Sequence, residues 1–144
     1  MDERKTKSNK QPITMSHLKL NHPIVIYDSN APNQQFFIND LRNKNHAIRE
    51  IEINVCPVSE KYLIHIMENI ELKPTRALIN TASPWYRCFA EDLTEMSAFV
   101  LLRTLRDFPS LLKTPIVILE NDIFIDPSLE DLSQSHEENE EVFA

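Results

Sequence analysis

The side chains best suited to nucleophilic or redox chemistry in this chain are its two thiols, Cys56 and Cys88. A thiolate can attack a disulfide or an oxyanion, so each thiol is a candidate nucleophile. Cys56 follows an apolar alternating pattern and could be either a reactive surface thiol or a small packed hydrophobe. Cys88 stands among aromatic residues in WYRCF, which favours packing in the core. The histidines lack the spacing of metal ligands, so we expect neither a metal site nor a cofactor.

A short polar segment has the position of an active-site loop. It joins the apolar run at residues 24–27 to a helical pattern that contains Phe36, Phe37 and Leu41. The loop holds no Cys, Gly, Lys or Arg, and its polar or turn-forming residues are Asp28, Ser29, Asn30, Pro32, Asn33 and Gln35. These residues suit a capped turn that starts a helix. Alternatively they could line a small-ligand pocket at the helix N-terminus, although the carboxylate of Asp28 would repel an anion there.

The composition excludes several classes of function. The chain has 144 residues, a net charge of −7 and no glycine. Without glycine there can be no P-loop, no dinucleotide fingerprint and no nucleophile elbow. The negative charge argues against direct binding of nucleic acid. No apolar run is long enough to span a membrane, and two cysteines are too few for a disulfide scaffold, so we expect a cytoplasmic protein.

The elements that must position these residues follow from apolar periodicity. Strands are predicted at residues 23–27, 50–55, 116–119 and 123–125. Helices are predicted at residues 33–44, after a Ser59 cap to residue 70, after a Thr94 cap to about residue 109, and at 127–132, with short helical turns at 76–80 and 84–89. Residues 1–21 are predicted to be a flexible arm, with Met15 as a second candidate start, and residues 133–144 an acidic disordered tail.

The order βαβ, helical block, ββα predicts an α/β domain of mixed α+β type at residues 22–132. It is the thioredoxin-like plan, a mixed four-stranded sheet with helices on both sides. Folds of this kind keep a cis-proline before the third strand, and Pro115 has that position.

Four segments resemble the arsenate reductase (ArsC)/Spx family, in the family's order and over residues 24–132. They are IVIYDSNAPNQQ, NVCPVSEKYL, TRALINTASPWYRCF and FPSLLKTPIVILENDIFIDPSLEDL. The resemblance places the family's catalytic cysteine at Pro32 and the resolving cysteine of Spx-type relatives at Gln35. It places the three arginines that hold the oxyanion at Asn80, Thr114 and Asp126. Because the nucleophile and all three cations are replaced, we expect no arsenate reduction at this loop.

The sequence therefore predicts a redox-inactive member of this fold that acts by binding, with a protein partner of unknown identity. Spx, a family member that works through a protein partner (the C-terminal domain of the RNA polymerase α subunit), is the precedent. The candidate binding residues are Trp85, Tyr86, Thr114 and Pro115, of which the two aromatics could equally cap the core. A thiol-dependent reductase with its nucleophile moved to Cys56 and a small-molecule binding domain at the loop remain as alternatives.

Overall fold

Four short strands form one mixed sheet, in the order β2-β1-β3-β4. The computed structural model describes residues 20–44, 47–69, 77–120, 122–127 and 131–132. Strand β1 (Ile24–Tyr27) runs parallel to β2 (Arg49–Glu52) and antiparallel to β3 (Ile116–Ile118), which pairs with β4 (Ile123–Ile125) as a hairpin. The predicted four-stranded mixed sheet is confirmed, and its central strand β1 leads directly into the candidate loop.

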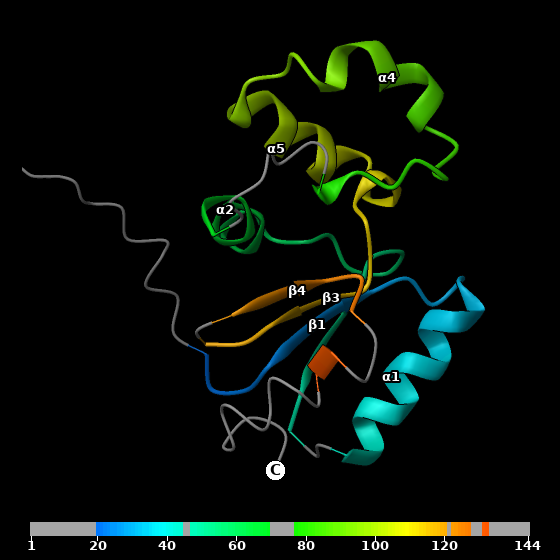
Figure 1. Cartoon of the computed structure of the whole chain (residues 1–144), viewed down its shortest axis with the longest axis vertical. Helices are drawn as coiled ribbons and strands as arrows, with labels where there is room; N and C mark the ends of the chain where they lie inside the picture. The colour runs from blue at the N-terminus through cyan, green and yellow to red at the C-terminus, as the bar shows by residue number, and fades with distance from the viewer. Residues whose placement is uncertain (1–19, 45–46, 70–76, 121, 128–130, 133–144) are drawn as a thin grey trace, which may run out of the picture.

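Helices cover both faces of this sheet (Figure 1). Helix α1 (Pro32–Lys44) lies on one face, and α2 (Glu60–Glu68) and α5 (Ala98–Asp107) lie on the other. Helix α4 (Tyr86–Leu93) lies beyond α5, and the short 3-10 helix η3 (Pro109–Leu111) returns the chain toward β3. The helix between the parallel strands β1 and β2 is the crossover that such a pair requires.

The core is divided between the two faces because the side chains of a strand alternate. In β1, Ile24 and Ile26 point toward α2 and α5, whereas Val25 and Tyr27 point toward α1. The α1 side is completed by Phe37, Ile38, Leu41, Val117, Leu119 and Leu132. All four residues of β1 are buried, which explains why this strand reads as a continuous apolar run rather than an alternating one.

Several predicted boundaries were wrong by a few residues. Strand β2 ends at Glu52 rather than at residue 55, because the Val55 and Cys56 amides turn back to donate to the Glu52 carbonyl at 3.1 and 2.9 Å. Helix α1 starts one residue earlier than predicted, at Pro32, and β3 ends at Ile118.

The prediction that Thr94 caps the helix before Pro109 was also wrong. Ser97 is the N-cap of α5, and its hydroxyl accepts a hydrogen bond from the Val100 amide at 3.2 Å. Thr94 instead ends α4, a longer helix than the turn predicted at residues 84–89. Ser59 is the N-cap of α2 as predicted, although its side chain makes no capping hydrogen bond.

The remaining predictions concern the cis-proline, the two ends of the chain and membrane-spanning helices. The Thr114-Pro115 peptide bond is cis, as predicted. The predicted arm up to residue 19, the tail from residue 133 and residues 128–130 of the predicted helix at 127–132 lie outside the described residues. Within the described ranges, none of the helices has both the length and the apolar character to cross a membrane.

Candidate functional site

The candidate loop lies where three chain segments meet: the end of β1, the turn after β2 and the cis-proline turn before β3. Gln34, in the first turn of α1, joins two of these segments. Its side-chain oxygen accepts from the Asp28 amide at 2.9 Å, and its side-chain nitrogen donates to the Thr114 carbonyl at 3.1 Å. Only 8% of Gln34 is exposed. This side chain therefore ties the loop to the cis-proline turn.

Glu52, the last residue of β2, ties the loop to the second strand. Its carboxylate accepts from the Ser29 amide at 2.6 Å and from the Asn54 amide at 2.6 Å. The Asn54 side chain also donates to Glu52 at 2.8 Å and to the Asp28 carboxylate at 2.7 Å. The side-chain amide of Asn54 thus holds the two carboxylates together at the loop end of the sheet.

The charge on Glu52 is stabilised in this network. Desolvation, the largest single influence, raises the pKa of the Glu52 carboxyl, but the hydrogen bonds from Ser29 and Asn54 together lower it to about 2. Hydrogen bonds to a charged form favour that form. Glu52 is consequently ionised at neutral pH, and the loop end of the sheet carries negative charge.

The loop itself is a turn closed by its own backbone. The Ala31 amide donates to the Asp28 carbonyl at 3.2 Å, and the Asn30 amide donates to the Asp28 carboxylate at 2.9 Å. Pro32 follows as the first residue of α1, where a missing N–H leaves no hydrogen bond unmade. Asn33 is exposed, and Gln35 donates weakly to the Ser29 carbonyl at 3.4 Å.

The positions matched to the family's arginines have other roles here. The Asn80 side chain donates to the Ser110 carbonyl at 3.1 Å and accepts from the Ala82 amide at 3.1 Å. Thr114 contributes its carbonyl to Gln34. Asp126 has a left-handed backbone (φ 55°), which Asp tolerates better than most residues, and its amide donates to the Pro115 carbonyl at 2.7 Å. The Asn80 and Thr114 contacts are those of structural residues.

Both thiols lie at the surface. Cys88 is exposed, so the prediction that it packs in the core was wrong. The reason is that α4 buries only Leu93 and turns the face with Cys88 to solvent. Cys56 is also exposed, and its sulfur contacts the Pro57 carbonyl at 3.7 Å. It lies in the turn after β2, and therefore at the same end of the parallel strand pair as the loop.

The two candidate aromatic residues differ in their surroundings. The Trp85 ring packs against Phe108 with centroids 4.8 Å apart, yet 45% of Trp85 stays exposed. Tyr86 packs partly buried against the larger core cluster. Trp85 is held in place by its amide, which donates to the Ser83 hydroxyl at 3.1 Å. Trp85 thus combines a packed face with an open one, whereas Tyr86 mainly belongs to the core.

Gln34 is the residue that sequence reasoning missed. It has the same spacing as the buried residues Phe37, Ile38 and Leu41, so it stands on the core-facing side of α1. A polar side chain at a core-facing position indicates a buried hydrogen-bonding role. Within the described residues, there is no group of three or more His, Cys, Asp or Glu side chains that could hold a metal ion.

Known proteins resemble this chain in their structures and not at the level of detectable sequence families. No protein-family profile matches the sequence, and no curated protein sequence is significantly similar. A solved structure described as a possible arsenate reductase from Streptococcus mutans UA159 has a TM-score of 0.66 and 20% identity, covering 77% of this chain and 97% of that one. The arsenate reductase from Vibrio cholerae has a TM-score of 0.66 and 17% identity, covering 78% and 96%. The chain therefore has the thioredoxin-like fold of the arsenate reductase (ArsC) family.

Proposed function

We propose that this chain acts by binding a protein partner and not by thiol chemistry at the loop. The observation that carries the proposal is the loop itself: α1 starts at Pro32, which the resemblance matches to the family's nucleophile, beside the hydrogen-bonded carboxylates of Asp28 and Glu52. Structural neighbours carry the name arsenate reductase, and the proposal is that this chain departs from that activity.

The electrostatics of the loop oppose an oxyanion substrate. Arsenate reduction at such a site needs a thiolate and cationic groups around the anion. Here the pKa of Glu52 is lowered to about 2, so a negative charge stands at the loop at neutral pH. The side chain of Asn80, at one of the former cation positions, is used to hold backbone groups. An approaching anion would meet repulsion where the family supplies attraction.

The helical layer formed by α2 and α5 offers a surface for a partner. A groove of about 300 Å³ lies between α2 and α5 and is lined mainly by Ile64, Met67, Ala98, Phe99 and Leu102. Phe99 is 63% exposed and neighbouring Val100 is 45% exposed. Exposed aromatic and apolar side chains that gather at one place are typical of protein-binding surfaces. Together with half-exposed Trp85, they make the helical layer the proposed docking side.

A regulatory role in the cytoplasm, in the manner of Spx, is the form of this proposal that the family resemblance supports. The candidate binding residues Trp85, Tyr86, Thr114 and Pro115 remain part of it as predictions. Of these, Trp85 is the one whose exposed ring face is available to a partner.

A thiol-dependent reductase at Cys56 is the second candidate. Exposure of the thiol and its position at the loop end of the sheet favour it. Cys56 belongs to the turn after β2, where its amide donates to the Glu52 carbonyl at 2.9 Å.

One assay separates the two candidates. Reduction of arsenate and of a model disulfide would be measured with glutathione and glutaredoxin, for the native chain and for Cys56→Ser, Cys88→Ser and Pro32→Cys. We expect no turnover with the first three proteins. Pro32→Cys should also show no reduction of arsenate, because Asn80, Thr114 and Asp126 still replace the arginines that would bind the anion. Turnover that disappears only in Cys56→Ser would overturn the binding proposal.

The partner itself is approached by site-specific photocrosslinking in cells. A crosslinker at position 99 or 85 should give one discrete adduct, whereas position 36, where Phe36 is 72% exposed on the α1 side, is the control. The identified partner would then be purified, and Phe99→Ser should weaken its binding about tenfold or more. Equal crosslinking at all three positions, or unchanged affinity of Phe99→Ser, would contradict the proposed surface.

A further inference from the structure

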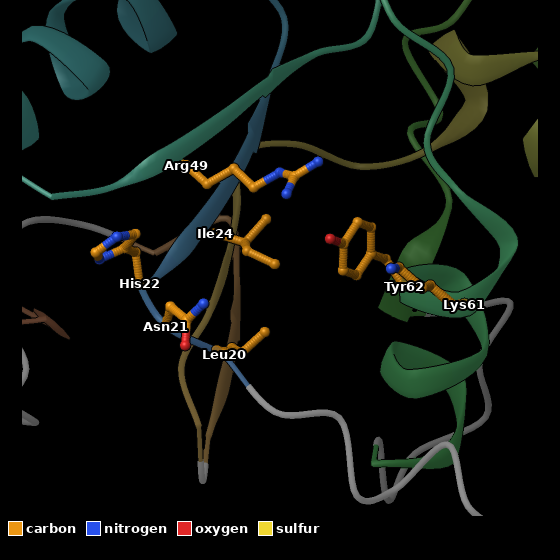
Figure 2. A pocket seen from close by; sticks show the side chains of 7 residues that line it. All are labelled: Leu20, Asn21, His22, Ile24, Arg49, Lys61 and Tyr62. Carbon is orange, nitrogen blue, oxygen red and sulfur yellow. The ribbon is translucent and has the colours of Figure 1, made fainter.

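A second pocket lies at the opposite end of β1 from the candidate loop. It has a volume of about 210 Å³ and lies where the chain enters the sheet, between the start of β1, the start of β2 and the first turn of α2 (Figure 2). Polar and charged side chains line it: Asn21, His22, Arg49, Lys61 and Tyr62. Ile24 and Leu20 supply its apolar wall.

The cations of this pocket are not paired with acidic side chains among the residues that the structure describes. In the described residues, neither Arg49 nor Lys61 forms an ion pair. The acidic residues next to them in sequence are engaged elsewhere. Glu50 is bound by Arg42 at 2.6 Å, and Glu60 is bound by Arg106. In a chain whose net charge is −7, this leaves a local concentration of positive charge.

The hydroxyl of Tyr62 is a buried polar group that faces this pocket. Tyr62 is only 5% exposed, and its hydroxyl has no hydrogen-bond partner in the part of the chain that the structure describes. Figure 2 shows this hydroxyl directed into the pocket, toward the side where Ile24 and Arg49 lie. Buried tyrosine hydroxyls usually find a partner. The Lys61 ammonium lies over the same ring, 5.2 Å from its centre, so a cation lies next to the phenol.

We propose that this pocket binds a small organic anion, a carboxylate or a phosphate ester. Arg49 and Lys61 hold the anionic group, and the Tyr62 hydroxyl donates to one of its oxygens. The carbon part of the ligand lies against Ile24 and Leu20. The size fits, because a cavity of about 150 Å³ is enough for benzene. The site is distinct from the loop that the family uses, since the two lie at opposite ends of β1.

The proposal is tested by titrating the full chain with phenyl phosphate and with benzoate, followed by amide NMR shifts and by calorimetry. Benzyl alcohol, which has the same ring but no charge, is the control ligand. We expect saturable binding of at least one anion, with shifts that centre on the amides of residues 49, 61 and 62. Comparison of the two dissociation constants shows whether the pocket prefers the phosphate group of phenyl phosphate or the carboxylate of benzoate.

Variants decide whether the pocket residues are responsible. Arg49→Gln keeps the backbone hydrogen bond to the Pro23 carbonyl and should weaken anion binding about tenfold or more. Tyr62→Phe keeps the buried ring and should weaken it several-fold. Arg87→Gln, on the exposed face of α4, is the matched control and should bind as the native chain does. Equal affinity for benzyl alcohol, no binding of either anion, or unchanged affinity of Arg49→Gln would overturn the proposal.

Discussion

At the residue scale, single polar side chains hold the loop region in its shape. Glu52 bridges the loop and the turn after β2 through three donors, and Gln34 bridges the loop and the cis-proline turn. In each case one side chain satisfies backbone groups from segments that are distant in sequence. Unmet hydrogen bonds of partly buried backbone groups are costly, so both residues should matter for stability.

Glu52→Gln should destabilise the fold by about 1–2 kcal/mol at pH 7, after allowance for solvent screening of a part-exposed group. Its lowered pKa means that the ionised carboxylate contributes stability above about pH 4.5, and that this contribution is lost as the pH falls toward 2. Urea unfolding of both proteins from pH 7 to pH 2.5 should therefore show a difference that shrinks with acidity. Glu91→Gln, on exposed α4, is the control and should follow the native curve.

Gln34→Ala should cost about 1–3 kcal/mol of unfolding free energy, because the Asp28 amide and the Thr114 carbonyl both lose their partner. Gln35→Ala provides the matched control. That side chain is half-buried and makes one long hydrogen bond of 3.4 Å, so little change is expected. Chemical denaturation compares the two, and equal losses would show that Gln34 is not a specific link.

At the scale of the elements, helix ends were the weakest part of the sequence-based prediction. Thr94 and Ser97 are both good N-cap residues, and they stand three positions apart in front of the same apolar pattern. Only the path of the chain between α4 and α5 decides which one begins the helix. The hydrogen bond from the Val100 amide assigns that role to Ser97.

Ser97→Ala should therefore destabilise the protein by about 1 kcal/mol, the usual cost of removing a capping oxygen. Thr94→Ala should have a much smaller effect, because Thr94 lies at the exposed end of α4. Thermal unfolding of the two variants measures the contrast. A larger loss in Thr94→Ala would contradict the observed helix start.

At the scale of the whole molecule, stability rests on burying both faces of a small sheet. Ile66 of α2 is fully buried in the cluster that also contains Ile26 of β1 and Leu101 of α5. This cluster packs the helical layer, which contains the proposed docking groove, against the sheet. The two pockets and the loop thus occupy different parts of one scaffold: the groove between helices, the anion pocket at the start of β1, and the loop at its end.

Ile66→Ala should cost about 2–5 kcal/mol, since it leaves a cavity where the helical layer meets the sheet. Val55→Ala removes apolar carbon from a side chain that is 83% exposed and should cost little. Denaturant midpoints of the two variants test this contrast. Similar midpoints would mean that the helical layer contributes little to the core.

The sequence by itself determined the sheet and the order of its elements, because buried strands and amphipathic helices leave periodic patterns. The cis bond at Pro115 was predicted from the likeness of that order to the thioredoxin-like fold. Through the resemblance to the arsenate reductase/Spx family the sequence also predicted that Pro32 stands at the position of the family's cysteine, by a count from Tyr27. Tertiary structure alone decided the bridging role of Gln34, the exposure of Cys88 and the pocket around Tyr62 where we propose that an anion binds. These features depend on contacts between segments far apart in sequence, and local periodicity does not predict such contacts.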